Sequence, residues 1–143
     1  MALHLIKLWV GHDSMAHLEE YQQNRLKQKI RDGEEPILLH ITRHFPKRAE
    51  ELLDGGSIYW VINGFIVGRQ KILELRHLTT DTGPHCGIVY DQELVHVRMR
   101  PHRPFQGWRY FEGKDAPPDV KKGQGGADVP EEMRRALAKL GLL

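Results

Sequence analysis

The segment from Pro46 to Leu75, PKRAEELLDGGSIYWVINGFIVGRQKILEL, constrains the fold more than any other part of this chain. Gly55 and Gly56 end its helical first part, because glycine readily adopts the positive φ angles at which a helix gives way to a strand. Asn63-Gly64 then lies between two apolar runs, which is the strongest short-range signal for a β-hairpin. The segment therefore predicts a short helix followed by two antiparallel strands.

The same reasoning divides the rest of the chain into strands and helices. Strands are predicted at 3–10, 37–41, 57–62, 65–78, 86–90 and 94–99, helices at 14–31, 46–53 and 128–143, and a short strand or packed loop at 105–111. The later strands follow one another too closely for crossover helices, which argues against a doubly wound sheet. The order predicts an α+β domain whose sheet is curled and mostly antiparallel, or a small β-barrel.

We expect this domain to span residues 1–119 and to be followed by a glycine-rich linker at 120–127. The C-terminal helix at 128–143 carries one apolar stripe, so it can dock on its own domain or associate with another copy of the chain. Within the long second hairpin strand, Gly68 is predicted to mark a bulge or a close approach of another part of the backbone.

Charge and cysteine content restrict the classes of partner. The 143-residue chain has a formal net charge of only +2, so a nucleic-acid partner would need a local basic patch. Cys86 is the single cysteine, which excludes an intrachain disulfide and fits a reducing compartment. No apolar run approaches the ~18–20 residues of a membrane span, so we expect a cytoplasmic protein without a membrane partner.

Basic and aromatic residues form the main candidate binding site. Guanidinium groups bind phosphate through paired hydrogen bonds, and aromatic rings stack on bases with about 1–3 kcal/mol each. If these groups converge on one face, they predict an RNA or nucleotide site. The candidate residues are Arg43, Lys47, Arg48, Trp60, Arg69, Gln70, Trp108 and Arg109.

Strand geometry leaves structural alternatives open for several of these residues. Tyr59 and Trp60 are neighbours on a strand and point to opposite faces, so at least one is expected in the core. Only one of Arg69 and Gln70 can point inward, for the same reason. A buried Arg69 would need a carboxylate partner. The candidate partners are Glu50, Glu51, Asp54 and Glu74.

Catalytic and metal-binding motifs give little support to an enzyme. His40 and His44 lie at a strand end and in a loop, and no HExxH motif or paired cysteines accompany them, so no metal and no cofactor are expected. Lys47 with Glu51 or Glu74 could supply acid–base chemistry, although Lys47 and Glu51 are spaced as an ordinary helix-surface ion pair. Walker A, GxGxxG and Gly-x-Ser-x-Gly motifs are absent from the sequence.

Three blocks of the sequence resemble one bacterial family, the domain of unknown function 1489. The blocks are HLIKLWVG, HITRHFPKRAEELLDGGSIYWVINGFIVGRQKIL and RPFQGWRYF with the following DAPPD, which together cover residues 3–119. This resemblance implies no established activity.

The Leu-Leu-Asp-Gly-Gly helix end and the Val-Gly step in the second hairpin strand also resemble the ASCH branch of PUA-like barrels. That resemblance implies a small curved β-sheet or barrel with flanking helices and a groove for RNA or a nucleotide. The ASCH pattern has a Lys and a Glu in the strand after the glycine, where this chain has Ser57, Ile58, Tyr59 and Trp60. The resemblance therefore extends to the barrel and the groove and leaves out the catalytic pair.

The leading hypothesis is an RNA- or nucleotide-binding module with a PUA-like fold. One alternative is a small hydrolase that acts on a modified nucleoside or a related ligand, with Lys47 and a carboxylate as its acid–base groups. Another is a non-catalytic interaction domain whose C-terminal helix contacts a partner.

Overall fold

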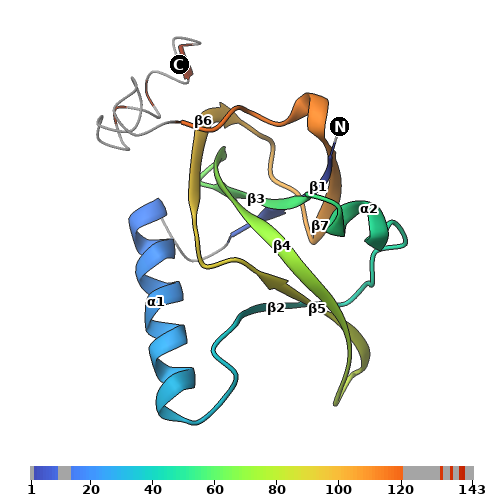
Figure 1. The fold of residues 1–143 in the computed structure, drawn as a ribbon. Helices are drawn as coiled ribbons and strands as arrows, with labels where there is room; N and C mark the ends of the chain where they lie inside the picture. Colours follow the sequence, from blue (N-terminus) through green and yellow to red (C-terminus); the bar gives the residue numbers. More distant parts are fainter. Residues whose placement is uncertain (1, 10–13, 121–132, 134–135, 137–138, 141–143) are drawn as a thin grey trace.

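The computed structural model describes residues 2–9, 14–120, 133, 136, 139 and 140 (Figure 1). The described part is a strand-rich α+β domain, as predicted. Its elements in chain order are β1 (Leu3–Leu8), α1 (Met15–Arg31), β2 (Leu38–Thr42), α2 (Ala49–Leu53), β3 (Ser57–Ile62), β4 (Phe65–Thr80), β5 (Gly83–Tyr90), β6 (Val95–Pro101), β7 (Trp108–Glu112) and the 3₁₀ turn η1 (Gly113–Asp115).

These strands form one mixed, curled sheet that does not close. The order is β2-β5-β4-β3-β1-β7, and β6 pairs with β4. The sheet is mostly antiparallel, as predicted, but β1 and β3 pair in parallel, which the sequence did not indicate. A parallel pair needs a long connection, and here α1, β2 and α2 supply it.

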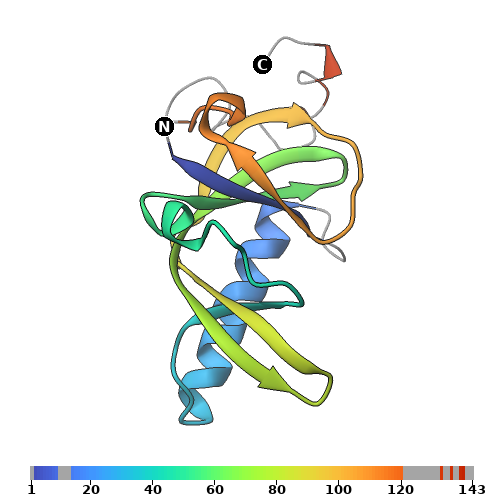
Figure 2. The same ribbon diagram turned by 90° about the vertical axis from the view of Figure 1, so that its right-hand side faces the viewer.

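Strand β4 is the central strand of the sheet and pairs with three other strands. Its first half pairs with β3 on one edge and with β6 on the other, and its second half pairs with β5 (Figures 1 and 2). The turn from β3 into β4 has positive φ at Asn63 (50°) and Gly64 (81°), which confirms the predicted hairpin. The β4–β6 register shifts between Ile66 and Gly68, which confirms the irregularity predicted there.

Gly68 also lies directly against the first turn of α1. A Cβ atom on Gly68 would lie 2.4 Å from Cε of Met15 and 3.1 Å from the carbonyl oxygen of Val95. The missing side chain therefore makes room for the first turn of the helix. Ser14 caps that turn, since its hydroxyl oxygen accepts a hydrogen bond from the backbone N–H of His17 at 3.2 Å, and the helix therefore begins within one residue of the predicted position 14.

The alternation of side chains along β3 separates two apolar clusters. Ile58, Trp60 and Ile62 belong to the larger core on the side of α1, which we call the helix face. Tyr59 and Val61 belong to a smaller cluster on the opposite side, which we call the outer face. Tyr59 and Trp60 therefore point to opposite sides, as predicted, and both are buried.

The segment that follows β7 runs back along β6. The backbone N–H of Arg98 donates to the carbonyl of Pro118, and that of Val120 donates to the carbonyl of His96, both at 2.9 Å. Asp119 forms an isolated antiparallel bridge with Val97. Residues 113–120 therefore form a strap against β6, close to the outer face.

A buried amide network joins α1 to the sheet. The side-chain oxygen of Gln70 accepts hydrogen bonds from Nε1 of Trp60 (2.8 Å) and from Nε2 of Gln22 (2.8 Å). Nε2 of Gln70 donates to the side-chain oxygen of Gln22 (2.7 Å) and to the carbonyl of Asp91 (3.0 Å). The side chains of Trp60 and Gln70, two of the predicted ligand-binding residues, thus bond to other groups of the core.

Parts of the predicted organisation fall on residues whose structure is not described. The linker at 120–127 lies outside the described residues except for Val120, and the helix at 128–143 does so except for four scattered positions. Its predicted self-association therefore stays a prediction. Within the described part of the chain, none of the helices combines the length and the apolar character that crossing a membrane requires.

We expect Gln70→Leu to lower the free energy of unfolding by about 3–4 kcal/mol, because it leaves Trp60 Nε1 buried without a partner and removes both bonds between the Gln22 amide and Gln70. The double variant Gln22→Leu/Gln70→Leu should recover part of this loss, since it removes one unsatisfied amide. Urea denaturation measures both changes. Gln23→Leu, on the exposed side of α1, is the control and should stay within about 0.5 kcal/mol of the parent. If Gln70→Leu lowered the free energy of unfolding no more than the control does, the amide network would not contribute substantially to stability.

Candidate ligand-binding site

A small pocket lies beside α1, where the helix faces β2 and the end of β5. Its volume is about 110 Å³. None of the described residues that line it is acidic. We call it the α1 pocket, and its lining residues are Trp9, Tyr21, Arg25, Lys29, Ile37, Leu38, Leu39, His40 and Tyr90.

Helical spacing explains one wall of this pocket. Tyr21, Arg25 and Lys29 are four residues apart, so their side chains lie above one another on one side of α1. The opposite wall comes from the paired strands, where Leu38 of β2 lies opposite Tyr90 of β5. The sequence thus places an aromatic ring and two cations in a single row along the pocket.

Edge-to-face contacts hold the aromatic rings of the pocket in place. The ring of Trp9 lies 5.8 Å from Tyr21 and 4.6 Å from Trp60, with interplanar angles of 67° and 89°. Tyr90 also contacts Trp60, at 5.8 Å. Trp60 is fully buried, so its contribution is to support the rings of Trp9 and Tyr90 from behind.

Burial and neighbouring charges, among them the carboxylates of Glu34 and Glu35 near Lys29, determine the electrostatics here. Nζ of Lys29 donates to the carbonyl of Ile37 at 2.8 Å, and burial followed by Arg25 lowers the pKa of this lysine. Burial, with a smaller contribution from Lys7, lowers the pKa of His40 to about 4. His40 is therefore a neutral polar group at physiological pH, and the positive charge of the pocket comes from Arg25 and Lys29.

Part of the predicted basic–aromatic constellation assembles elsewhere, where the segment after β2 packs against β7. Nε1 of Trp108 donates to the carbonyl of His44 at 3.3 Å, and the backbone N–H of Arg48 donates to the hydroxyl of Tyr110 at 3.1 Å. Arg43 and Lys47 are exposed on this segment, and neither forms an ion pair with a residue that the structure describes. We call residues 43–48 with Trp108 the β7 surface.

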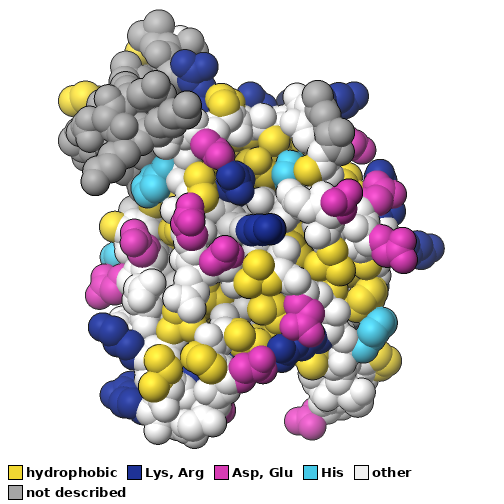
Figure 3. Space-filling view, viewed as in Figure 1, with side chains coloured by type: hydrophobic (Ala, Val, Ile, Leu, Met, Phe, Trp, Pro, Cys, Tyr) yellow, Lys and Arg dark blue, Asp and Glu magenta, His cyan; other side chains and the backbone are white. Residues whose placement is uncertain are grey.

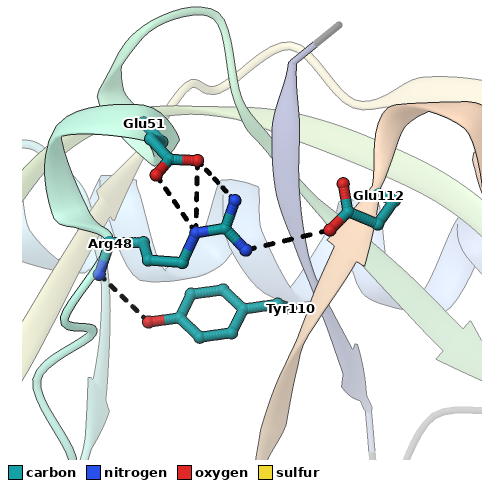
Figure 4. A network of polar contacts seen from close by, with 4 residues as sticks. All are labelled: Arg48, Glu51, Tyr110 and Glu112. Atoms are coloured by element: carbon teal, nitrogen blue, oxygen red, sulfur yellow. Dashed lines mark hydrogen bonds and ion pairs between the residues drawn. The ribbon is translucent and has the colours of Figure 1, made fainter.

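Arg48 has a structural role within this surface (Figure 4). Its guanidinium binds Glu51 through Nε and Nη2, at 3.1 and 2.5 Å, and approaches Glu112 at 3.8 Å. The group also lies 5.4 Å from the ring centre of Tyr110. The hydrogen bond to Arg48 lowers the pKa of the exposed Glu51 carboxyl. Arg48 therefore connects α2 to β7 and is already satisfied by protein groups.

The remaining predicted cations lie on the outer face. Arg69 forms two hydrogen bonds with Asp119, at 2.8 and 2.7 Å, so its carboxylate partner is none of the four that the sequence suggested. Arg109 lies over the ring of Phe105 at 5.4 Å, and alternation along β7 points it away from the side of Trp108.

The eight predicted residues therefore divide among three places. Arg43, Lys47, Arg48 and Trp108 share the β7 surface, Trp60 and Gln70 lie in the core, and Arg69 and Arg109 lie on the outer face. Figure 3 shows Lys and Arg interspersed with Asp and Glu on the face viewed there. The eight residues therefore do not converge on one face of the molecule.

The residues of the proposed acid–base chemistry do not form a catalytic group. Lys47 is exposed, Glu51 is held by Arg48, and Glu74 pairs with Arg76 at 3.1 Å.

Among the described residues, no three His, Cys, Asp or Glu side chains lie close enough together to hold a metal ion.

Comparison with known proteins identifies one family. A family model described as a protein of unknown function (DUF1489) matches residues 5–143. Neither the comparison with curated proteins nor that with solved structures returned a match.

We expect protein stability to fall as the pH decreases from about 6.5 to about 4, in part because of His40. In this range the unfolded chain binds a proton at His40 and the folded protein does not, since burial lowers the folded-state pKa. The contribution is about 2–3 kcal/mol. In His40→Gln this contribution is absent, so the urea midpoint should depend less steeply on pH than in the parent protein. His17→Gln, on the exposed side of α1, is the matched control. If the pH profiles of His40→Gln and the parent protein were parallel, His40 would not be a source of the pH dependence of stability.

Proposed function

The chain belongs to the DUF1489 family, whose function is unknown, and we propose that it binds a nucleotide, free or within an RNA strand, at the α1 pocket. The observation that carries the proposal is the combination of aromatic walls, two cations and a lining without acidic residues. A nucleotide offers the matching groups, a planar ring and a phosphate. No catalytic role is part of the proposal.

Pocket size limits the buried part of the ligand to one ring at most. The volume of about 110 Å³ is smaller than the cavity of about 150 Å³ that accepts a benzene ring, so the sugar and phosphate of a nucleotide would lie outside the pocket. Tyr21 is 43% exposed, so its ring is accessible at the edge of the pocket. Stacking on such a ring contributes about 1–3 kcal/mol per base.

Arg25 and Lys29 are suited to the phosphate. Both lie on the helical row that passes Tyr21, so a ring against Tyr21 places its attached phosphate beside the same side of α1. Arginine has five N–H donors, and among the described residues the Arg25 side chain donates one long hydrogen bond, of 3.4 Å, to Gln28. Its guanidinium therefore has donors left for phosphate oxygens.

An RNA strand would extend beyond the pocket to the β7 surface. His40 lines the pocket on β2, and the exposed Arg43 and Lys47 follow that strand directly. Their charges would attract the phosphates of neighbouring nucleotides, and Trp108 offers a partly exposed ring. The curled, open sheet is compatible with a PUA-like fold, which remains part of the proposal together with the RNA groove.

We expect Arg25→Ala/Lys29→Ala to weaken binding of uridine monophosphate and of a short uridine-rich RNA at least tenfold. Quenching of tryptophan fluorescence measures both affinities. Because two phosphate contacts are lost, the slope of log K against log salt for the RNA should decrease in magnitude by about 1.4. Tyr21→Ala should weaken both ligands without changing this slope.

Lys27→Ala is the matched control, since Lys27 lies on the other side of the helix and is exposed. It removes one positive charge and should leave the mononucleotide affinity unchanged. If Lys27→Ala and the double variant weakened ligand binding equally, the loss of affinity would reflect only the change in net charge. That result would overturn the proposed site. Absence of binding by the parent protein at low salt would overturn the proposed function itself.

A further inference from the structure

A second hollow lies on the outer face, separate from the α1 pocket. Its volume is about 340 Å³, and it is bounded by β1, β3 and β4 on one side and by the 113–120 strap on the other. Its lining residues are His4, Gly55, Ser57, Tyr59, Arg69, Gly113, Ala116, Pro117, Pro118 and Asp119. We call it the outer hollow.

His4 presents a hydrogen-bond donor in this hollow. The backbone N–H of Ser57 donates to Nδ1 of His4 at 2.9 Å, so Nδ1 carries no proton. Burial, and then Arg69, lower the pKa of His4, which favours the neutral ring with its proton on Nε2. The residue is only 8% exposed, and its Nε2–H forms no hydrogen bond with a described residue.

Tyr59 presents a second donor beside the first. Its side chain is 4% exposed, and its ring lies 4.9 Å from that of His4 at an interplanar angle of 70°. The hydroxyl group forms no hydrogen bond within the described part of the chain. Two side chains that are more than nine-tenths buried thus line the outer hollow with unused polar groups.

Arg69 supplies the positive charge. Three of its five N–H groups are used, two by Asp119 and one by the hydroxyl of Ser57 at 3.0 Å. Asp119 is the one acidic residue of the lining, and both of its carboxylate oxygens accept these hydrogen bonds. Two N–H groups of Arg69 therefore remain for a ligand, and the groups left unused in the hollow are mainly donors.

We propose that the outer hollow binds a small oxyanion, a carboxylate or a phosphate group, through His4, Tyr59 and Arg69. The oxygens of the anion accept hydrogen bonds from Nε2–H of His4, from the hydroxyl of Tyr59 and from the free N–H groups of Arg69. Such charge-assisted hydrogen bonds are the stronger class in proteins. The site does not depend on the nucleotide proposal, because it uses the opposite face of the sheet.

Histidine-selective ¹⁵N NMR of the full chain tests the site in two steps. The spectrum without added anion should show His4 as a neutral ring protonated on Nε2. Titration with inorganic phosphate and, separately, with acetate at constant ionic strength should then shift the Nε2 resonance of His4 saturably, whereas chloride should not. A response to one anion alone supports the site and identifies its class of ligand.

Tyr59→Phe tests the second donor, since it removes only the hydroxyl group. We expect about five- to tenfold weaker anion binding, the effect of one lost hydrogen bond. Tyr110→Phe is the matched control, because Tyr110 lies on the other side of the sheet, and it should leave the affinity unchanged.

Three outcomes would overturn the proposal. One is a His4 ring protonated on Nδ1, and another is a shift that chloride reproduces. The third is equal affinity in Tyr59→Phe and the parent. Arg25→Ala/Lys29→Ala should not change the anion response, so failure of the nucleotide proposal and failure of this one are distinguishable.

Discussion

The side-chain amide of Gln70 connects three parts of the molecule that are far apart in sequence. It bonds to Gln22 of α1, to Trp60 of β3 and to the backbone of Asp91 after β5. These bonds fix the helix across one face of the sheet, and they hold the indole of Trp60 at the back of the α1 pocket. Because a buried amide is costly unless all its hydrogen bonds are made, this arrangement favours one position of α1 over others. The pocket walls depend on that position.

Local signals in the sequence predicted most of the elements. The Asn-Gly turn, the Ser14 cap and the glycine at the β4 irregularity each act through the conformation of one or two residues, so they can be recognised without the fold. The parallel pairing of β1 with β3 could not be recognised in this way. It depends on which strands meet after a connection of about fifty residues, and no local pattern specifies that. α2 likewise begins at Ala49, later than the predicted residue 46, because residues 47 and 48 form a turn.

The candidate sites were harder to predict, for a reason seen in the arginines. Arg48 and Arg69 are residue types that suit a phosphate site, but Glu51, three residues further along the chain, already binds Arg48, and Asp119, fifty residues further along, already binds Arg69. Sequence alone does not reveal a partner as distant as Asp119. The α1 pocket had a signal that could be read, since Tyr21, Arg25 and Lys29 recur every fourth residue and must share a helix side. Nothing in the sequence shows that β2 packs beside this row, so the pocket itself could not be predicted.

Strand β3 contributes to both hollows, and its alternation separates the two contributions. Ser57 and Tyr59 serve the outer hollow, whereas Trp60 supports the α1 pocket from the other side of the same backbone. Substitutions at Ser57 or Tyr59 therefore change the outer hollow, and substitutions at Trp60 change the α1 pocket. The two cavities can in this way change independently during evolution, although a single strand contributes to both.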